Sequence, residues 1–237
     1  MLVALWSPKG GSGTSVLAAA CSLVLAREAG GAARLADLDG DQPAIFGLGA
    51  EPSLGLLDWL NAGADAPTDA LDRLAVEAAP GVALLPRGGS ERTLAPVAAA
   101  EAGAALAVAL RDGPVPTIID CGRAVEPATR AVAEVADVSV IVVRGCYLAL
   151  RRALRAPALA CSAGVVLVEE KERSLSEKEV ADVLDLPVYA RVGVRTPIFR
   201  AVDAGVLAAR LPEQLARPAS ALVRRVGLAS TRRGAAA

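Results

Sequence analysis

The chain of 237 residues contains no histidine, and its four cysteines, Cys21, Cys121, Cys146 and Cys161, include no CxxC pair. Without histidine, catalytic Ser–His and Cys–His pairs are excluded, and a zinc site built from closely spaced Cys and His is not expected. We therefore interpret the four thiols as small core residues in a reducing compartment.

The sequence also lacks an uninterrupted apolar run of the about 18–20 residues needed to cross a membrane, although 54% of its residues are hydrophobic. The longest candidate, 16–26, contains Ser22 and ends at Arg27 and Glu28, which indicates a buried helix. The amino terminus has no basic segment and no small-residue cleavage site, so no secretion signal is expected. We expect a cytoplasmic protein.

Lysine is scarce, because only Lys9, Lys171 and Lys178 are present, whereas arginine and alanine are frequent. The net charge is −1, yet the segment from Arg195 onward holds eight arginines against Asp203 and Glu213. This positive segment is a candidate for non-specific contact with DNA phosphates. The general preference for arginine weakens that interpretation.

Short apolar runs alternate with helical stretches, which is typical of βαβ units around a mostly parallel sheet. We expect strands at 2–6, 34–38, 82–86, 117–121, 138–143, 165–168 and 188–192. Helices are expected at 14–29, 54–62, 67–78, 94–111, 126–135, 147–155, 176–184, 197–208 and 213–226. The predicted fold is a single doubly wound α/β domain over 1–228, with a flexible tail at 229–237.

Residues 7–16, SPKGGSGTSV, form a glycine-rich loop between the first predicted strand and the first predicted helix. Glycines allow successive backbone N–H groups to converge on an anion, and the helix N-terminus adds its dipole. The loop therefore predicts a phosphate-binding site. Such loops usually end in Gly-Lys-Ser/Thr, whereas this one ends in Gly13, Thr14 and Ser15.

Carboxylates follow two of the predicted strands. Asp37, Asp39 and Asp41 alternate after the second strand, and Asp120 ends an apolar strand in the manner of a Walker B element. Side chains at these strand ends face the crevice where doubly wound folds bind ligands. There they can hold the water shell of Mg²⁺ or position a water for attack on a γ-phosphate. For Asp41 alone, a polar exit from the strand is the simpler interpretation.

Several segments occur in the order seen in the MinD/ParA superfamily of deviant Walker A P-loop ATPases, which the chain resembles over 1–228. They are KGGSGTS, LADLDGDQPAIFGLGAEPSLGLLDWL, GVALLPRGGS, TIIDCGRAVEPATRAVAEVADVSVIVV and LPVYARVGVRTPIFRAVDAG. The resemblance implies that ATP and Mg²⁺ are the ligands and that the protein forms a homodimer around them.

The resemblance also implies roles for individual residues. Lys9 matches the lysine that reaches across the dimer to the partner's phosphates, and Asp39 matches the residue that positions the attacking water. The metal ligands implied are Ser15, Asp39 and Asp120. The nucleotide-binding residues implied are Lys9, Gly10, Gly11, Ser12, Gly13, Thr14, Ser15, Asp37 and, near the base, Glu169.

Two positions depart from the family pattern. Thr14 replaces the second loop lysine, which contacts the phosphates of its own subunit, and Glu169 stands where an asparagine usually reads adenine. Losing the lysine's charged hydrogen bonds removes about 1.5–3 kcal/mol of binding free energy, or roughly ten- to 150-fold in affinity. Weak ATP binding with slow or absent hydrolysis is therefore expected. Glu169 either accepts a hydrogen bond from the adenine amine or repels the phosphates.

Threonine at the lysine position resembles the CpaE/TadZ branch, whose members localise pilus-assembly machinery. The first hypothesis is therefore a nucleotide-linked, dimeric positioning protein that recruits a pilus, secretion or other polar machine. The alternatives are a nucleotide-independent pseudo-ATPase scaffold and an active ParA-type ATPase that binds DNA non-specifically.

A membrane-proximal location is a further option, because the segment 221–230 is basic and amphipathic. It places Leu222, Val223, Val226 and Leu228 beside Arg224 and Arg225. Such a segment suits a membrane-binding helix or a last packing helix equally well.

Overall fold

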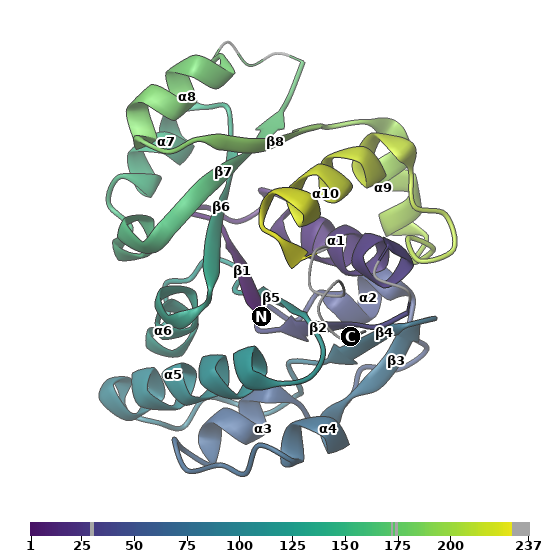
Figure 1. Ribbon diagram of the computed structural model, residues 1–237, viewed down its shortest axis with the longest axis vertical. Coiled ribbons are helices and arrows are strands. Elements are labelled where there is room, and N and C mark those ends of the chain that lie inside the picture. The colour runs from purple at the N-terminus through teal and green to yellow at the C-terminus, as the bar shows by residue number, and fades with distance from the viewer. Residues whose placement is uncertain (29–30, 172, 174, 229–237) are drawn as a thin grey trace, which may run out of the picture.

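The computed structural model describes residues 1–28, 31–171, 173 and 175–228 (Figure 1). The tail expected at 229–237 lies outside the described residues. Within them, eight strands form one sheet in the order β3-β4-β2-β5-β1-β6-β7-β8. Their bounds are β1 (Leu2–Trp6), β2 (Ala33–Asp37), β3 (Val76–Ala79), β4 (Val82–Leu85), β5 (Thr117–Asp120), β6 (Val138–Arg144), β7 (Ser162–Glu169) and β8 (Val188–Gly193).

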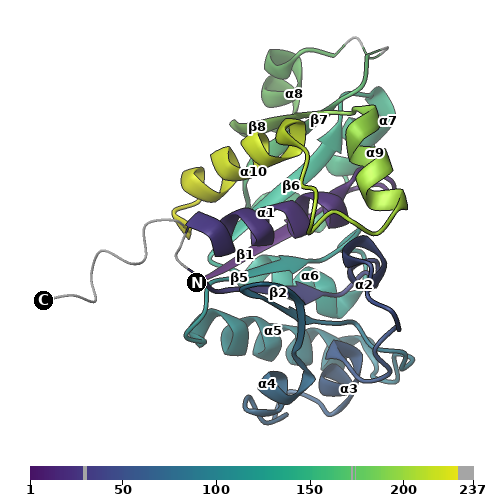
Figure 2. The same ribbon diagram turned by 90° about the vertical axis from the view of Figure 1, so that its right-hand side faces the viewer.

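Helices cover both faces of the sheet, and each face has its own hydrophobic core (Figure 2). One face carries α1 (Thr14–Glu28), α2 (Gln42–Phe46), α9 (Thr196–Asp203) and α10 (Glu213–Arg225). The other carries α3 (Leu56–Asn61), α4 (Ala70–Leu74), α5 (Pro96–Asp112), α6 (Pro127–Val135), α7 (Tyr147–Ala153), the 3-10 helix η1 (Pro157–Cys161) and α8 (Glu177–Leu184). The predicted doubly wound α/β fold is confirmed.

The strands have continuous apolar runs because helices cover both faces of the sheet. In β1, Val3 and Leu5 belong to the core under α1, whereas Leu2, Ala4 and Trp6 belong to the core on the opposite face. Strands buried on both faces need apolar residues at every position, so they show no alternation in the sequence.

One predicted helix is wrong in its second half. The helix expected at 67–78 ends after Leu74, and Val76–Ala79 form the edge strand β3, which pairs antiparallel with β4. Leucine and alanine favour a helix there, but Pro80 and Gly81 make a tight turn that folds the segment back as a hairpin. The short elements α2 and η1 were not expected. The strand predicted at 2–6 has the expected bounds, and the other predicted strands and helices are present with displaced ends.

The carboxyl-terminal helix α10 packs beside α1, as both views show (Figures 1 and 2). Leu222, Val223, Val226 and Leu228 are all buried in this core. These are the four apolar side chains on which the membrane-binding alternative depends, so residues 221–228 pack against the core in this structure. Among the described residues, no helix combines the length and apolar character that a membrane crossing requires.

Helices α5 and α6 approach each other closely because small residues line their contact. A Cβ added at Gly103 of α5 would lie 2.3 Å from the backbone oxygen of Ala128 of α6. Real Cβ atoms do not come so close, so any side chain at this position must push the helices apart.

We expect Gly103→Ala to lower the free energy of unfolding by about 1–3 kcal/mol, as overpacking of a close contact does. Urea unfolding of the purified variant measures this. Gly49→Ala is the matched control, because none of the described atoms lies within 4 Å of a Cβ added there. Equal stabilities for the two variants would contradict the close helix contact.

Candidate functional site

A cavity of about 600 Å³ lies at the carboxyl ends of the parallel strands. The glycine loop and the first turn of α1 form one wall. A second, largely apolar wall comes from Val168 of β7, Val192 of β8, and Ile198 and Phe199 of α9. Doubly wound folds bind ligands at this edge of the sheet, and the volume suits a ligand of nucleotide size.

The loop is held in shape by its own hydroxyl groups. The backbone oxygen of Lys9 accepts hydrogen bonds from Ser12 Oγ at 2.7 Å and from Ser7 Oγ at 3.1 Å. Gly11 and Gly13 have φ of 75° and 81°, which only glycine adopts at low cost. The chain therefore turns tightly and enters α1 at Thr14.

Two side chains of the first helical turn lie at the cavity. Thr14 and Ser15 are buried and both line it, and Thr14 Oγ1 has no hydrogen-bond partner among the described residues. A buried hydroxyl without a partner is costly, and an anion in the cavity offers it an acceptor.

Behind the loop, Asp37 and Asp120 occupy paired positions on neighbouring strands β2 and β5. Both are fully buried, and so is Gln42. Asp37 accepts hydrogen bonds from the backbone N–H groups of Asp39, Gly40 and Gln42 at 2.7–3.0 Å. This network fixes the end of β2 and the start of α2.

Gln42 connects this network to the loop. Its Nε2 donates to Asp120 Oδ2 and to the backbone oxygen of Ser15, each at 3.0 Å. Asp120 Oδ1 accepts from the backbone N–H of Gly122 at 3.0 Å. One amide group therefore connects the end of β5 with the first turn of α1.

Burial, with a smaller contribution from the charge of Asp120, raises the pKa of Asp37 to about 7. Burial likewise raises the pKa of Asp120 to about 6, and a hydrogen bond from Ser15 opposes that shift. Two carboxylates of raised pKa indicate negative charge that the folded chain compensates poorly.

Asp39 is the predicted site carboxylate that lines the cavity directly. Partial burial and then the neighbouring Asp41 raise its pKa, whereas Arg123, Arg87 and Arg92 lower it. Gly122, with φ of 56°, leaves room for this side chain, because an added Cβ would lie 2.3 Å from Asp39 Oδ1.

A magnesium ion fits this site only together with phosphate. Within the part of the chain that the structure describes, no group of three or more His, Cys, Asp or Glu could hold a metal ion by itself. Mg²⁺ commonly binds through one or two protein oxygens, substrate phosphates and water. Ser15 at the cavity and the buried, poorly compensated Asp120 behind it provide such a partial set.

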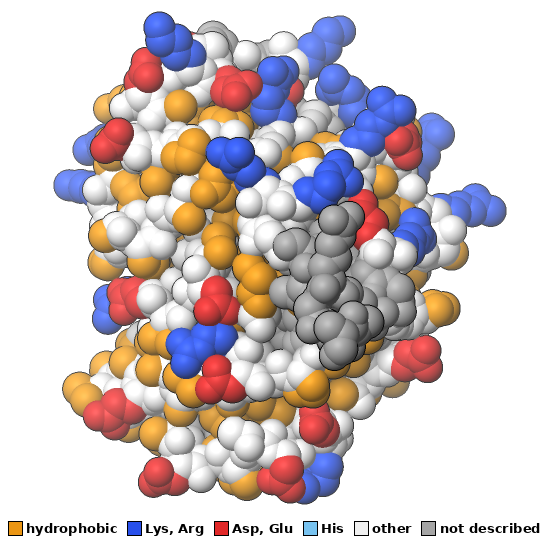
Figure 3. All heavy atoms as spheres, in the orientation of Figure 1, with side chains coloured by type: hydrophobic (Ala, Val, Ile, Leu, Met, Phe, Trp, Pro, Cys, Tyr) orange, Lys and Arg blue, Asp and Glu red, His pale blue; other side chains and the backbone are white. Residues whose placement is uncertain are grey.

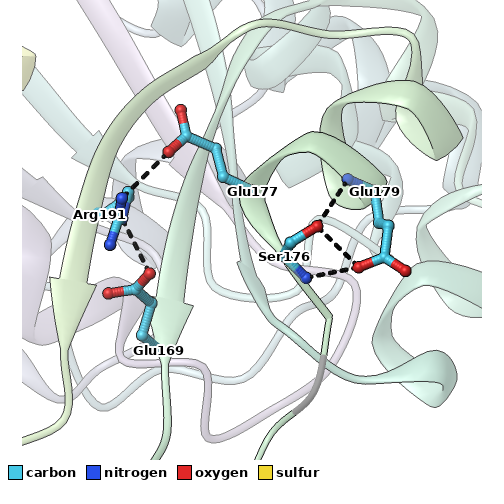
Figure 4. Close-up of polar contacts among 5 residues, drawn as sticks. All are labelled: Glu169, Ser176, Glu177, Glu179 and Arg191. Carbon is cyan, nitrogen blue, oxygen red and sulfur yellow. Dashed lines mark hydrogen bonds and ion pairs between the residues drawn. The ribbon is translucent and has the colours of Figure 1, made fainter.

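The predicted site residues do not all lie at the cavity. Residues 10–15 and Asp39 line it, whereas the described residues Lys9, Asp37, Asp120 and Glu169 are not among its lining residues. Glu169 instead forms an ion pair of 2.8 Å with Arg191, which also contacts Glu177 at 3.3 Å (Figure 4). Its carboxylate is therefore already engaged.

Three functional candidates were missed in the sequence. Gln42 is the most readily detectable of them, because it is a polar residue that follows the aspartate cluster directly. Arg123 and Arg144 follow or end β5 and β6, the two neighbours of β1, and both line the cavity. Because arginine is frequent throughout the chain, the sequence did not distinguish these two arginines from the others.

No protein-family description matches the sequence, and no curated protein matches it either. Solved structures do match. The chain superposes on a ParA family ATPase from Chlorobium tepidum TLS with a TM-score of 0.76 and 21% identity, covering 96% of each chain. The chain has the ParA/MinD fold.

Two further structures with this fold hold nucleotide. The septum site-determining protein MinD from Pyrococcus horikoshii OT3, complexed with Mg-ADP, matches with a TM-score of 0.76 and 18% identity over 95% of each chain. An aspartate-to-alanine variant of McdA from Cyanothece, in complex with ATP, matches with a TM-score of 0.70 and 18% identity over 95% of this chain and 96% of that one.

We expect the chain without nucleotide or Mg²⁺ to lose stability as the pH rises from about 4 to 7. In this window the folded state still holds protons on Asp37 and Asp120, while the same groups in the unfolded chain are ionised. The free energy of unfolding then falls by up to about 1.4 kcal/mol per pH unit for each such proton.

Asp120→Asn should reduce this slope, because it removes one titrating group and relieves the repulsion on Asp37. Urea unfolding at several pH values between 4 and 7 measures it. Asp65→Asn, at an exposed position, should leave the slope unchanged. If the free energy of unfolding falls with pH as steeply in Asp120→Asn as in the wild type, burial does not raise the pKa of Asp120.

Proposed function

We propose that this protein binds ATP with Mg²⁺ in the cavity and acts as a positioning protein of the MinD/ParA type. The observation that carries the proposal is the position of the glycine loop, which forms one wall of a cavity of about 600 Å³ at the strand ends. The backbone N–H groups of 11–15 and the N-terminus of α1 would hold the phosphates. The apolar wall from β7, β8 and α9 would receive the base.

The roles of the side chains follow from their positions. Ser15 Oγ would be a ligand of Mg²⁺, with Asp120 acting behind it, and the metal would offset the charge of the transferred phosphoryl group. Asp39 would orient the attacking water. Asp37 lies outside the cavity and would act by fixing the backbone of the loop that carries Asp39.

Hydrolysis is expected to be slow or absent. Transition-state charge on the phosphates is best stabilised by fixed cations close to them. Thr14 has only a hydroxyl at the position where a lysine would point into the site. The protein would therefore use nucleotide mainly for binding and assembly, at most as a slow ATPase.

Assembly would be a homodimer in which Lys9 reaches the partner's nucleotide. Its position supports this, since Lys9 opens the loop but does not line its own subunit's cavity. The cargo would be a pilus, secretion or other polar machine, because the threonine at the loop-lysine position resembles the CpaE/TadZ branch. The alternative is a pseudo-ATPase scaffold that dimerises without nucleotide. The nucleotide titration described below distinguishes it from a nucleotide-binding positioning protein.

DNA binding is the second alternative. Lys and Arg side chains are frequent on the upper part of the face in Figure 3, and Asp and Glu are more frequent on its lower part. Two arginines of the carboxyl-terminal segment form ion pairs within the chain, since Arg217 contacts Glu213 and Arg224 contacts Glu28. This internal pairing reduces the charge offered to phosphates and favours the positioning hypothesis.

Titration with a fluorescent ATP analogue and Mg²⁺ tests nucleotide binding. We expect weak, saturable binding by the wild type. Ser15→Ala should weaken it by about tenfold through loss of the metal ligand. Ser53→Ala, at an exposed position, should not. Absence of saturable binding by the wild type up to millimolar nucleotide would contradict the proposal and leave the scaffold alternative.

Analytical ultracentrifugation with and without Mg-ATP tests the dimer. Lys9→Ala should abolish the nucleotide-dependent dimer while leaving the affinity of the monomer for nucleotide unchanged. Lys178→Ala, an exposed lysine on α8, is the control. If Lys9→Ala dimerises like the wild type, the dimer does not depend on contact between Lys9 and the partner's nucleotide.

A further inference from the structure

The loop lacks its usual internal lysine, but a cation lies beside it from another strand. Arg144 is the last residue of β6, which pairs in parallel with β1, the strand that leads into the loop. Its guanidinium reaches over the loop, since Nη2 would lie 3.9 Å from a Cβ added at Gly11. Arg144 also lines the cavity.

The hydrogen bonds of Arg144 are incomplete. Nη1 forms an ion pair of 2.8 Å with Glu170 Oε1, while Nε is buried and has no partner among the described residues. Glu170 has a second cation, because its Oε2 contacts Arg173 Nε at 2.7 Å. Glu170 would therefore keep a partner if Arg144 turned toward an anion in the cavity.

Among the described residues, two other arginines line the cavity but are less suited to bind phosphate. Arg123 lies on the other side of the loop, near Gly10, and its charge acts on the carboxylate of Asp39 in the same cavity. Arg195 donates from Nη1 to the backbone oxygen of Val194 at 2.9 Å, on the side of β8. Arg144 combines a place beside the glycines with a buried donor that lacks a partner within the described part of the chain.

We propose that Arg144 makes the charged contact with the polyphosphate that Thr14 cannot make. The inference rests on the proposed nucleotide binding and adds a specific residue to it. The guanidinium can give two parallel hydrogen bonds to phosphate oxygens, which a lysine cannot. When the polyphosphate binds, the guanidinium of Arg144 leaves Glu170 and contacts a phosphate oxygen. Glu170 keeps its ion pair with Arg173. The cation of the site is thus supplied by β6 instead of by the loop.

Arg144→Gln, titrated with Mg-ATP and separately with inorganic tripolyphosphate, tests this inference. We expect the affinity for both to fall by about ten- to 100-fold, the loss typical of a charged hydrogen bond. Equal losses for the two ligands would place the contact at the phosphates and not at the base. Arg151→Gln, at an exposed position on α7, removes the same charge nearby in sequence and should bind like the wild type.

A second variant separates a phosphate contact from a folding defect. The double variant Thr14→Lys, Arg144→Gln is compared with the single variant Thr14→Lys. Because a lysine at position 14 places a cation at the same phosphates, Arg144→Gln should cost less affinity in the Thr14→Lys background than in the wild type, whereas a purely structural loss would be equal in both.

The outcomes distinguish the two proposals. If the wild type binds neither ATP nor tripolyphosphate, the proposed function fails, and this inference fails with it. If the wild type binds both and Arg144→Gln binds as tightly as Arg151→Gln, only the role of Arg144 is overturned. An equal loss of affinity from Arg144→Gln in the wild-type and Thr14→Lys backgrounds would also overturn it.

Discussion

The site depends on two buried carboxylates held side by side. The parallel register of β2 and β5 places Asp37 opposite Asp120, and the buried amide of Gln42 connects Asp120 to the first turn of α1. The same two aspartates fix the chain that follows each strand through backbone N–H groups. The glycine loop, the start of α2 and the segment carrying Asp39 therefore all take their positions from one small network.

Charge in the site is divided between two sides. Negative charge is concentrated behind the loop, where burial raises the pKa of Asp37 and Asp120. The cations Arg123 and Arg144 flank the loop from the strands on either side of β1. Thr14 contributes no charge between them. A polyphosphate carrying Mg²⁺ would bring an anion to the arginines and a cation toward the carboxylates. We therefore expect the polyphosphate and Mg²⁺ to bind together.

Much of the fold was predictable from the sequence, because strands covered on both faces form unbroken apolar runs that end in recognisable turns. Besides the short elements α2 and η1, the exception is β3, a short edge strand rich in alanine, whose pairing depends on a hairpin turn that local propensity does not reveal. In the candidate site, the loop and the strand-end aspartates were predicted from their position after strands. Gln42 and Arg144 were missed because their positions near the loop arise from the sheet order, which places β5 and β6 on either side of β1, and β2 beside β5. Glu169 was expected near the base, but its side chain is engaged by Arg191 across the strand pair β7–β8, a contact that sequence spacing does not encode.

The most direct measurement is a crystal structure of this chain with Mg²⁺ and a non-hydrolysable ATP analogue. We expect the polyphosphate against the backbone N–H groups of 11–15, the metal bonded to Ser15 Oγ, and Arg144 turned from Glu170 to a phosphate oxygen. A cavity without ligand at saturating analogue, or an analogue whose phosphates point away from the loop, would contradict the proposal that this chain binds a nucleotide at the glycine loop.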